Sequence, residues 1–237
     1  MDLSIVVPAY NEARHLPELL NDLERLVLTA SCSVQVVVVD DGSQDNTWSL
    51  LQEACTLRPW LTVVRNDRNL GVGAALKIGA NQAAFPLVAW VSAYGADRLE
   101  DIWEMRRRLM DGVELVIASR SIHGGSYGDF PGLRVIGSRV FSLFGRYLLH
   151  LPVHDITNPF RAFRRSLMAD LPLVHEDYTI ALEILLKAVS YDKRIEEIPT
   201  VARRPHRDLS RKALFRRGWE YLRLALRARL IRLGGLE

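Results

Sequence analysis

Apolar runs alternate with amphipathic stretches through the first half of the chain. Leu3–Pro8, Val34–Val39 and Leu61–Val64 are short and rich in β-branched residues, which predicts buried strands. The run at 34–39 is too uniformly apolar for a sheet with one wet face, so it indicates a parallel sheet covered on both sides. Between the first two runs, Arg14–Leu28 carries leucines at helical spacing, and Asn11 is predicted to cap that helix.

The same alternation continues beyond the third strand. Strands and helices that alternate with short connections are typical of a doubly wound α/β sheet. A glycine-rich loop is expected at 121–132. The other predicted elements are helices over 47–55, 71–84, 99–110, 135–150 and 178–191, and strands over 87–91, 114–118 and 195–201.

Basic residues are concentrated at the C-terminus. Eleven basic residues stand against three acidic ones from Arg203 to Glu237, although the formal net charge of the chain is only +3. Apolar residues recur there at spacings of three and four, which predicts a long basic amphipathic helix. We therefore divide the chain into a domain over 1–210 and a basic amphipathic helical extension over 211–237. The apolar stripe consists of Phe215, Trp219, Leu222, Leu226, Leu230 and Leu233.

This helix suits an anionic membrane surface through residues 211–233, with Trp219 and Tyr221 at headgroup depth. The alternative is packing on the domain or on a second copy in a homodimer. No nucleic-acid-reading motif accompanies the charge, so nucleic acid is not an expected partner. The N-terminus lacks a secretory signal, and no window has the roughly 18 apolar residues of a membrane span. We expect a cytoplasmic protein, peripheral on the inner face of the membrane if the tail docks there.

Polar motifs follow the predicted strands. In an open parallel sheet, ligands bind beyond the carboxyl ends of the strands. Tyr10 therefore offers a flat face to a nucleobase, and Asp41 offers acceptors to its N–H groups. Asp40 or Glu12 would take ribose hydroxyls. The alternative for the acidic pair is a turn that precedes a helix capped by Asp45 or Ser43. The motifs are Val7-Pro8-Ala9-Tyr10-Asn11-Glu12 and Val39-Asp40-Asp41-Gly42-Ser43.

A third motif, Asn69-Leu70-Gly71-x-Gly73, begins the helix after the third strand. Gly71 and Gly73 would let the backbone approach a ligand, and the helix N-terminus would favour a phosphate.

These motifs, in this order, resemble family 2 glycosyltransferases of the GT-A fold, and especially dolichyl- or polyprenyl-phosphate mannose or glucose synthases. The resemblance runs from Leu3 to about Lys212. It also rests on Ser119-Arg120, Asp155-x-Thr157-Asn158-Pro159-Phe160-Arg161 and Glu197-Ile198-Pro199. It implies a GT-A nucleotide-diphospho-sugar transferase fold, and inverting transfer of a hexose from a nucleotide sugar of the GDP-mannose or UDP-glucose type to a polyprenyl phosphate or similar acceptor.

The resemblance also implies an acceptor site for the lipid phosphate. Arg120, Arg134 and Ser138 would hold that phosphate, and Arg139 could share the role; arginine forks suit phosphate oxygens. Asp155 either positions the acceptor or sugar, or caps the turn that follows it.

A last implication concerns a divalent cation. Family members place Asp-x-Asp directly after the fourth strand to hold Mg²⁺ or Mn²⁺, and Ser92 and Tyr94 occupy those positions here. Three hypotheses follow. Asp97 replaces the missing carboxylates and acts as metal ligand and catalytic residue. The enzyme works without metal. Or sugar transfer is lost, and the protein is a ligand- or partner-binding pseudoenzyme or has been repurposed for other chemistry.

Overall fold

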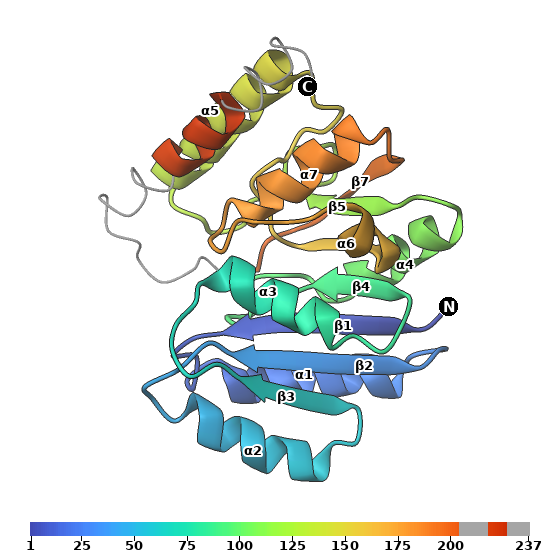
Figure 1. Cartoon of the computed structure of the whole chain (residues 1–237), viewed down its shortest axis with the longest axis vertical. Helices are drawn as coiled ribbons and strands as arrows, with labels where there is room; N and C mark the ends of the chain where they lie inside the picture. The colour runs from blue at the N-terminus through green and yellow to red at the C-terminus, as the bar shows by residue number, and fades with distance from the viewer. Residues whose placement is uncertain (204–217, 227–237) are drawn as a thin grey trace.

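A seven-stranded sheet forms the centre of the molecule (Figure 1). The computed structural model describes residues 1–203 and 218–226. The strand order is β3-β2-β1-β4-β6-β5-β7, and only β6 runs antiparallel to its neighbours in this sheet. The predicted doubly wound, mostly parallel sheet is therefore confirmed. The strands are β1 (Leu3–Ala9), β2 (Val34–Asp40), β3 (Leu61–Arg65), β4 (Leu87–Trp90), β5 (Leu115–Ser119), β6 (Arg161–Arg164) and β7 (Ile195–Pro199).

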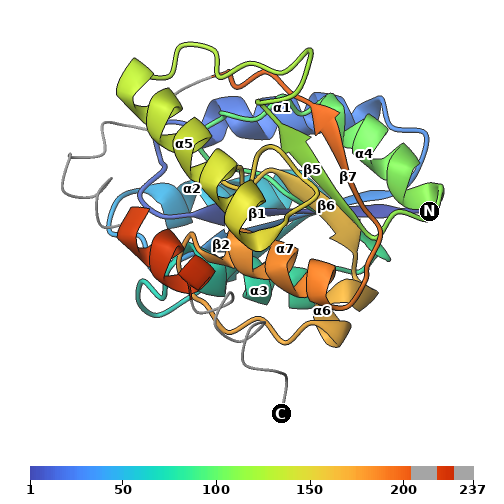
Figure 2. The same cartoon turned by 90° about the horizontal axis from the view of Figure 1, so that it is seen from above.

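Helices cover both faces of the sheet (Figure 2). One hydrophobic cluster joins one face of the sheet to α1, α2 and α4, and a second joins the other face to α3, α6 and α7. The strand β2, which lies between β3 and β1, is buried on both faces as its sequence predicted, with Val36 to Val39 fully buried. The helices are α1 (Leu16–Leu28), α2 (Thr47–Leu57), α3 (Val72–Asn81), α4 (Asp101–Met110), α5 (Gly132–Leu149), α6 (Ser166–Asp170) and α7 (Ile180–Ser190).

The antiparallel strand β6 was not predicted, because arginines at both of its ends hide the apolar pattern. Arg161 is nevertheless fully buried. Its Nε donates to the carbonyl of Asn158 (2.9 Å) and its Nη2 to that of Ile156 (3.0 Å), so backbone oxygens satisfy the guanidinium. Burial lowers the pKa of Arg161 to about 10. Because Arg161 pairs with Trp90 at the carboxyl end of β4, residues 155–160 reach that edge of the sheet.

The loop after β1 is tied to the loop after β2. Asn11 has a left-handed backbone (φ 55°), its amide donates to Ser43 Oγ (2.9 Å), and its Oδ1 accepts from the Gln44 amide (2.8 Å). The predicted cap of the first helix by Asn11 is therefore wrong; α1 begins only at Leu16. The second helix does begin with the predicted contact from Asp45, whose carboxylate accepts from the Thr47 amide at the start of α2 (3.0 Å).

Part of the predicted C-terminal helix packs on the domain. Residues 218–226 are helical and lie beside α5 (Figure 1), whereas 211–217 and 227–233 are outside the described residues. Tyr221 and Ala225 are buried; Tyr221 meets Phe141 edge to face at 5.3 Å and donates to the carbonyl of Tyr178 (2.7 Å). The predicted headgroup position of Tyr221 is therefore wrong. Within the described ranges, no helix is long and apolar enough to cross a membrane.

Candidate functional site

A cavity of about 530 Å³ opens at the carboxyl ends of β1, β2 and β4; we call it the edge cavity. Its walls come from the loops after these strands, the start of α3 and residue 220. Most of the residues that the sequence assigned to nucleotide binding meet here, as expected for loops at one edge of a parallel sheet. Those that line it are Pro8, Tyr10, Glu12, Asp41 and Gly71.

Asp41 holds the loop that leads into α3. Its Oδ1 accepts from Asn66 Nδ2 (2.7 Å) and the Leu70 amide (2.9 Å), and its Oδ2 accepts from the Gly71 amide (2.8 Å). Asp41 lines the edge cavity but is almost fully buried. Asp41 was predicted from the sequence as a ligand-binding residue, and the geometry adds a structural role, since its carboxylate holds the loop at 66–71 beside the cavity.

Asp40 does not reach the edge cavity. It is fully buried, its Oδ1 accepts from the Ser43 amide (3.1 Å), and its Oδ2 lies 3.3 Å from Arg65 Nε. Successive residues of a strand point to opposite faces, so only one of the two aspartates could face the ligand. The predicted contact of Asp40 with ribose is therefore wrong. Of the two carboxylates predicted to bind ribose hydroxyls, only that of Glu12 remains a candidate.

Gly71 and Gly73 at the start of α3 pack against the backbone of the segment before α7, where a phosphate was expected. The amides of Gly73 and Ala74 donate to the carbonyl of Glu176 (2.7 and 3.3 Å). A Cβ on Gly73 would lie 2.7 Å from the Glu176 carbonyl carbon, and one on Gly71 would lie 2.4 Å from its oxygen. The segment before α7 thus occupies the helix N-terminus, and the predicted phosphate site at Gly73 is wrong.

The segment after β4 folds back on itself. The amide and Oγ of Ser92 both donate to Asp97 Oδ2 (2.7 and 2.6 Å). Asp97 is buried and lines the neighbouring cavity, not the edge cavity, and burial raises its pKa. Among the described residues, no group of three or more His, Cys, Asp or Glu side chains is placed to hold a metal ion.

The donor set after β4 does not fit Mg²⁺ or Mn²⁺, which prefer several hard oxygen ligands. The Ser92 hydroxyl donates its hydrogen bond to Asp97, so it stays a neutral hydroxyl. Burial, and then the charge of Asp97, raise the pKa of the Tyr94 phenol, so this side chain stays protonated. Asp97 therefore does not restore the missing pair of carboxylates in this geometry.

A second cavity of about 500 Å³ lies between the carboxyl end of β5, α5 and residues 218–222; we call it the α5 cavity. The predicted phosphate ligands Arg120, Arg134 and Ser138 line it, whereas Arg139 does not. The guanidinium of Arg139 instead lies 5.5 Å from the ring centroid of Tyr127. The rest of the wall is largely apolar and includes Tyr127, Phe130, Leu133, Phe141 and Leu222.

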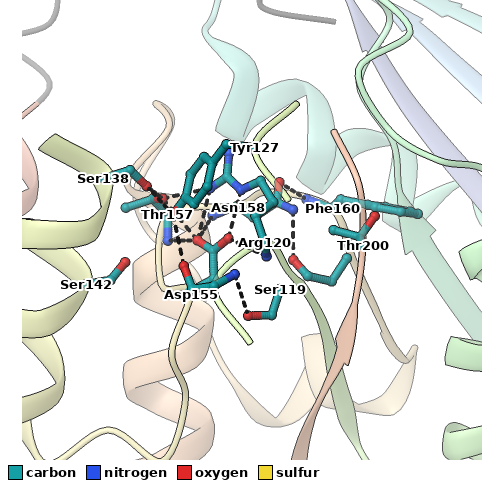
Figure 3. A network of polar contacts seen from close by, with 12 residues as sticks. Ser119, Arg120, Tyr127, Ser138, Ser142, Asp155, Thr157, Asn158, Phe160 and Thr200 are labelled. Atoms are coloured by element: carbon teal, nitrogen blue, oxygen red, sulfur yellow. Dashed lines mark hydrogen bonds and ion pairs between the residues drawn. The ribbon is translucent and has the colours of Figure 1, made fainter. Parts of the chain in front are cut away.

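Arg120 is held by a buried ion pair beneath this cavity (Figure 3). Its Nε and Nη2 donate to Asp155 Oδ2 (2.7 Å) and Oδ1 (2.9 Å), and Nη2 also donates to Thr157 Oγ1 (2.9 Å). Burial alone would raise the pKa of Asp155, but Arg120 outweighs it and the pKa lies below its ordinary value. Asp155 is fully buried and lines neither cavity. Its Oδ1 accepts from the amides of Thr157 and Asn158 (3.2 Å each), so the alternative that it caps the following turn is confirmed.

Hydroxyl groups extend this network to α5. Ser138 Oγ lies 2.6 Å from Thr157 Oγ1 and 3.1 Å from the Tyr127 hydroxyl, and the Arg120 guanidinium lies 4.6 Å from the centre of the Tyr127 ring. The sequence did not single out Tyr127 or Thr157 as site residues. Thr157 lies within a quoted motif, and Tyr127 is one of two aromatic residues, with Phe130, in the glycine-rich loop.

Three residues line both cavities: Tyr94, Pro159 and Tyr178. We call them the neck. Pro159 is there because β6 brings its preceding loop to the sheet edge, and Tyr178 because the chain before α7 docks on α3. The two cavities therefore adjoin at Tyr94, Pro159 and Tyr178.

Comparison with known proteins places these features in a family. Residues 4–171 match the family described as "Glycosyl transferase family 2". The chain is 27% identical over 202 residues to polyprenol monophosphomannose synthase of Mycolicibacterium smegmatis, covering 82% of this chain and 75% of the relative. It is 29% identical over 228 residues to dolichol-phosphate mannosyltransferase of Pyrococcus furiosus, covering 94% and 62%.

The fold also matches a solved structure. Glucosyl-3-phosphoglycerate synthase from Mycobacterium tuberculosis, in a complex with Mn²⁺, UDP and glucosyl-3-phosphoglycerate, superposes with a TM-score of 0.74 at 19% identity, over 96% of this chain and 79% of that chain. The GT-A fold expected from the resemblance is confirmed.

Proposed function

Since the chain belongs to glycosyl transferase family 2, we propose that it is an inverting enzyme that moves a hexose from a nucleotide sugar, of the GDP-mannose or UDP-glucose type, to a polyprenyl phosphate or similar acceptor. The observation that carries the proposal is the neck: two cavities of different character share Tyr94, Pro159 and Tyr178. A transferase needs two adjoining sites whose reacting atoms meet. Two relatives are named for polyprenol or dolichol phosphate and mannose.

The edge cavity takes the nucleotide sugar in this proposal. Its volume is within the range of small-molecule sites. Tyr10, at 40% exposure, offers its ring to the base, and Glu12 offers its carboxylate to ribose hydroxyls. The hexose then points towards Tyr94.

The α5 cavity takes the acceptor. Arg120 and Arg134 offer charged donors to the phosphate, and Ser138 adds a hydroxyl, while the aromatic and aliphatic wall suits the adjoining isoprene units. Asp155 fixes the orientation of the Arg120 fork from below. This orientation is what a bidentate contact to phosphate needs.

The reaction is a single in-line displacement. An acceptor phosphate oxygen attacks the anomeric carbon, the bond from that carbon to the diphosphate breaks, and the electron pair leaves with the nucleoside diphosphate. Because the attacking oxygen is already anionic near pH 7, no strong general base is required. Catalysis then depends on positioning and on stabilising the leaving group.

The outer face of α5 supports a location at a membrane surface. Its exposed apolar residues recur at helical spacing, opposite the buried Ser142, Gly145 and Leu149. Leu133 belongs both to this stripe and to the α5 cavity wall. Exposed Arg139 and Arg146 flank it, which suits anionic headgroups. The stripe is Leu133, Ile136, Val140, Leu143, Phe144 and Tyr147. We propose that this α5 stripe lies on the bilayer that contains the acceptor, beside the predicted tail.

Isothermal titration with GDP and UDP tests the donor half of the proposal. Wild type should bind one of the two, and Tyr10→Ala should weaken that binding about tenfold or more through loss of the stacked ring. Tyr191→Ala removes an exposed tyrosine at the end of α7 and is the matched control. If neither nucleotide binds, with or without Mn²⁺, the transferase proposal is rejected.

The second candidate function is a pseudoenzyme that binds a ligand or partner without transfer, or one repurposed for other chemistry. The observation in its favour is the Ser92–Asp97 pairing where relatives of this family are expected to carry metal ligands. Nucleotide binding without any sugar transfer to a lipid phosphate would favour this candidate.

A further inference from the structure

The wall of the edge cavity is acidic. Its described lining includes the acidic residues Glu12, Asp41, Asp177 and Glu220 and contains no Lys, Arg or His. A nucleoside diphosphate carries several negative charges, which increase when the sugar leaves. Positive charge or aimed hydrogen-bond donors must offset them in a site that excludes water. The carboxylates that would bring a cation are missing after β4, so another group has to do this.

Tyr94 is the polar side chain from that segment that reaches both cavities. It stands at the second of the two positions where a metal ligand is expected. Arg120 and Arg134 line the α5 cavity on the other side of the neck, and both favour negative charge at the Tyr94 phenol electrostatically. The same two guanidinium groups would therefore attract the negative charge of a leaving group at Tyr94.

We propose that the Tyr94 hydroxyl, supported by the positive charge of Arg120 and Arg134, binds the departing diphosphate and so replaces the divalent cation. The proposal rests on the transferase function above. A phenol ordinarily ionises near pH 10, and burial raises that pKa further, so Tyr94 remains a donor at neutral pH.

Charge balances in this step without a metal. The acceptor phosphate changes from a monoester dianion to a diester monoanion, and the nucleotide sugar releases a nucleoside diphosphate with one more negative charge. The Tyr94 proton stays on its oxygen and donates a hydrogen bond. The new charge thus appears next to a hydrogen-bond donor and within the field of Arg134 and of Arg120, which is paired with Asp155, and oriented donors and charges of this kind stabilise developing charge.

Isothermal titration with GDP and UDP in EDTA and again in Mn²⁺ is the test, with guanosine and uridine as probes that lack the phosphates. Wild type should bind its nucleotide with the same affinity in both buffers. Tyr94→Phe should weaken the diphosphate about tenfold or more, as expected for a hydrogen bond to a charged group, and leave the nucleoside unchanged. Tyr191→Phe, at an exposed site, should change neither.

A second variant tests the converse. Ser92→Asp with Tyr94→Asp restores the two carboxylates, and its nucleotide affinity should fall in EDTA and recover in Mn²⁺.

The outcomes separate this inference from the function on which it rests. If wild type binds its nucleotide only with Mn²⁺, or if Tyr94→Phe binds as wild type does in EDTA, the Tyr94 inference is overturned and the transferase proposal stands. If no nucleotide binds in either buffer, the transferase proposal fails, and the inference with it.

Discussion

Arg120 and Asp155 place two opposite charges beneath the α5 cavity. Asp155→Asn leaves a buried guanidinium without its counter-charge, which should lower the free energy of unfolding by about 3–5 kcal/mol at pH 7. Because the pKa of Asp155 is lowered by folding, its stabilisation is present above the ordinary pKa near 4 and is lost as pH falls through the folded value. Urea unfolding at several pH values measures both effects.

Asp111→Asn is the matched control for this change. Asp111 pairs with Arg107 at the surface, and pairs of this kind contribute little to stability, so the variant should unfold like wild type. Equal stability of Asp155→Asn and wild type at pH 7 would contradict the role assigned to the buried pair.

Asp97 should change stability with pH in the opposite direction to Asp155. Burial raises its pKa in the folded state, so protonated Asp97 favours folding at low pH and that contribution is lost as pH rises through the folded value. Asp97→Asn removes the buried charge and keeps acceptors for Ser92. Its melting temperature should exceed that of wild type by an amount that increases from pH 4.5 to pH 7.5, measured beside Asp22→Asn on α1. A difference that does not change with pH would contradict this account.

The convergence of the motifs at one sheet edge could be predicted from the sequence. The direction in which each side chain points could be predicted less well. Tyr10, Glu12 and Asp41 line the edge cavity as expected, because loops at one sheet edge must meet. The ribose contact predicted for Asp40 was wrong, and of the two roles left open for Asp155 the turn cap is the one observed. A carboxylate in a motif can bind the chain itself as easily as a ligand, and which one it binds depends on partners far away in the sequence. Arg65 and Arg120 are those partners.

At the scale of elements, the contact between α3 and the segment before α7 depends on a missing side chain. Gly73→Ala would put a methyl group 2.7 Å from the Glu176 backbone, so the segment that carries Tyr178 must shift. Overpacking of this kind costs about 1–3 kcal/mol. We expect a lower melting temperature and weaker nucleotide binding.

Gly137→Ala is the control. A Cβ at Gly137 would meet nothing within 4 Å, and the site is inside α5, so alanine should stabilise by about 0.5–1 kcal/mol. Loss of stability in Gly137→Ala, or none in Gly73→Ala, would argue against the packing described.

The α5 stripe carries a prediction about membranes. Ile136→Glu combined with Val140→Glu places two negative charges on its exposed face and should abolish co-sedimentation with anionic vesicles while leaving the melting temperature unchanged. Leu57→Glu, at an exposed leucine that ends α2, should bind vesicles as wild type does. Equal vesicle binding by all three proteins would reject the α5 stripe as a docking surface.

Helices with a single apolar face were the easiest elements to predict, and α5 explains where that method fails. Its apolar residues occupy two opposite faces, so the pattern predicted a helix and not the face that contacts the core. The strand β6 was not predicted because Arg161 looks like a surface residue in the sequence. It is buried because backbone carbonyls, brought near only in the folded chain, accept its hydrogen bonds. Both are tertiary effects that no local window contains.

For the whole molecule, the arrangement of strands creates the site. The parallel strands β1, β2 and β4 bring the predicted loops to one edge, and the antiparallel β6 brings the loop before it to the same edge. Residues 218–222 then close the α5 cavity from the other end of the chain. Two cavities and a neck thus form from segments more than a hundred residues apart, so the motifs are visible in the sequence but the contact between the two cavities is not.

The central claim is that sugar passes through this neck from a nucleotide to a lipid phosphate. The most direct measurement is transfer of labelled hexose from GDP-mannose and UDP-glucose to a polyprenyl phosphate in anionic vesicles, followed by organic extraction. We predict labelled lipid from one donor with wild type, and at least about a hundredfold less with Arg134→Ala, which loses a charged contact to the acceptor phosphate. Nucleotide binding by wild type with no labelled lipid from either donor would contradict the account.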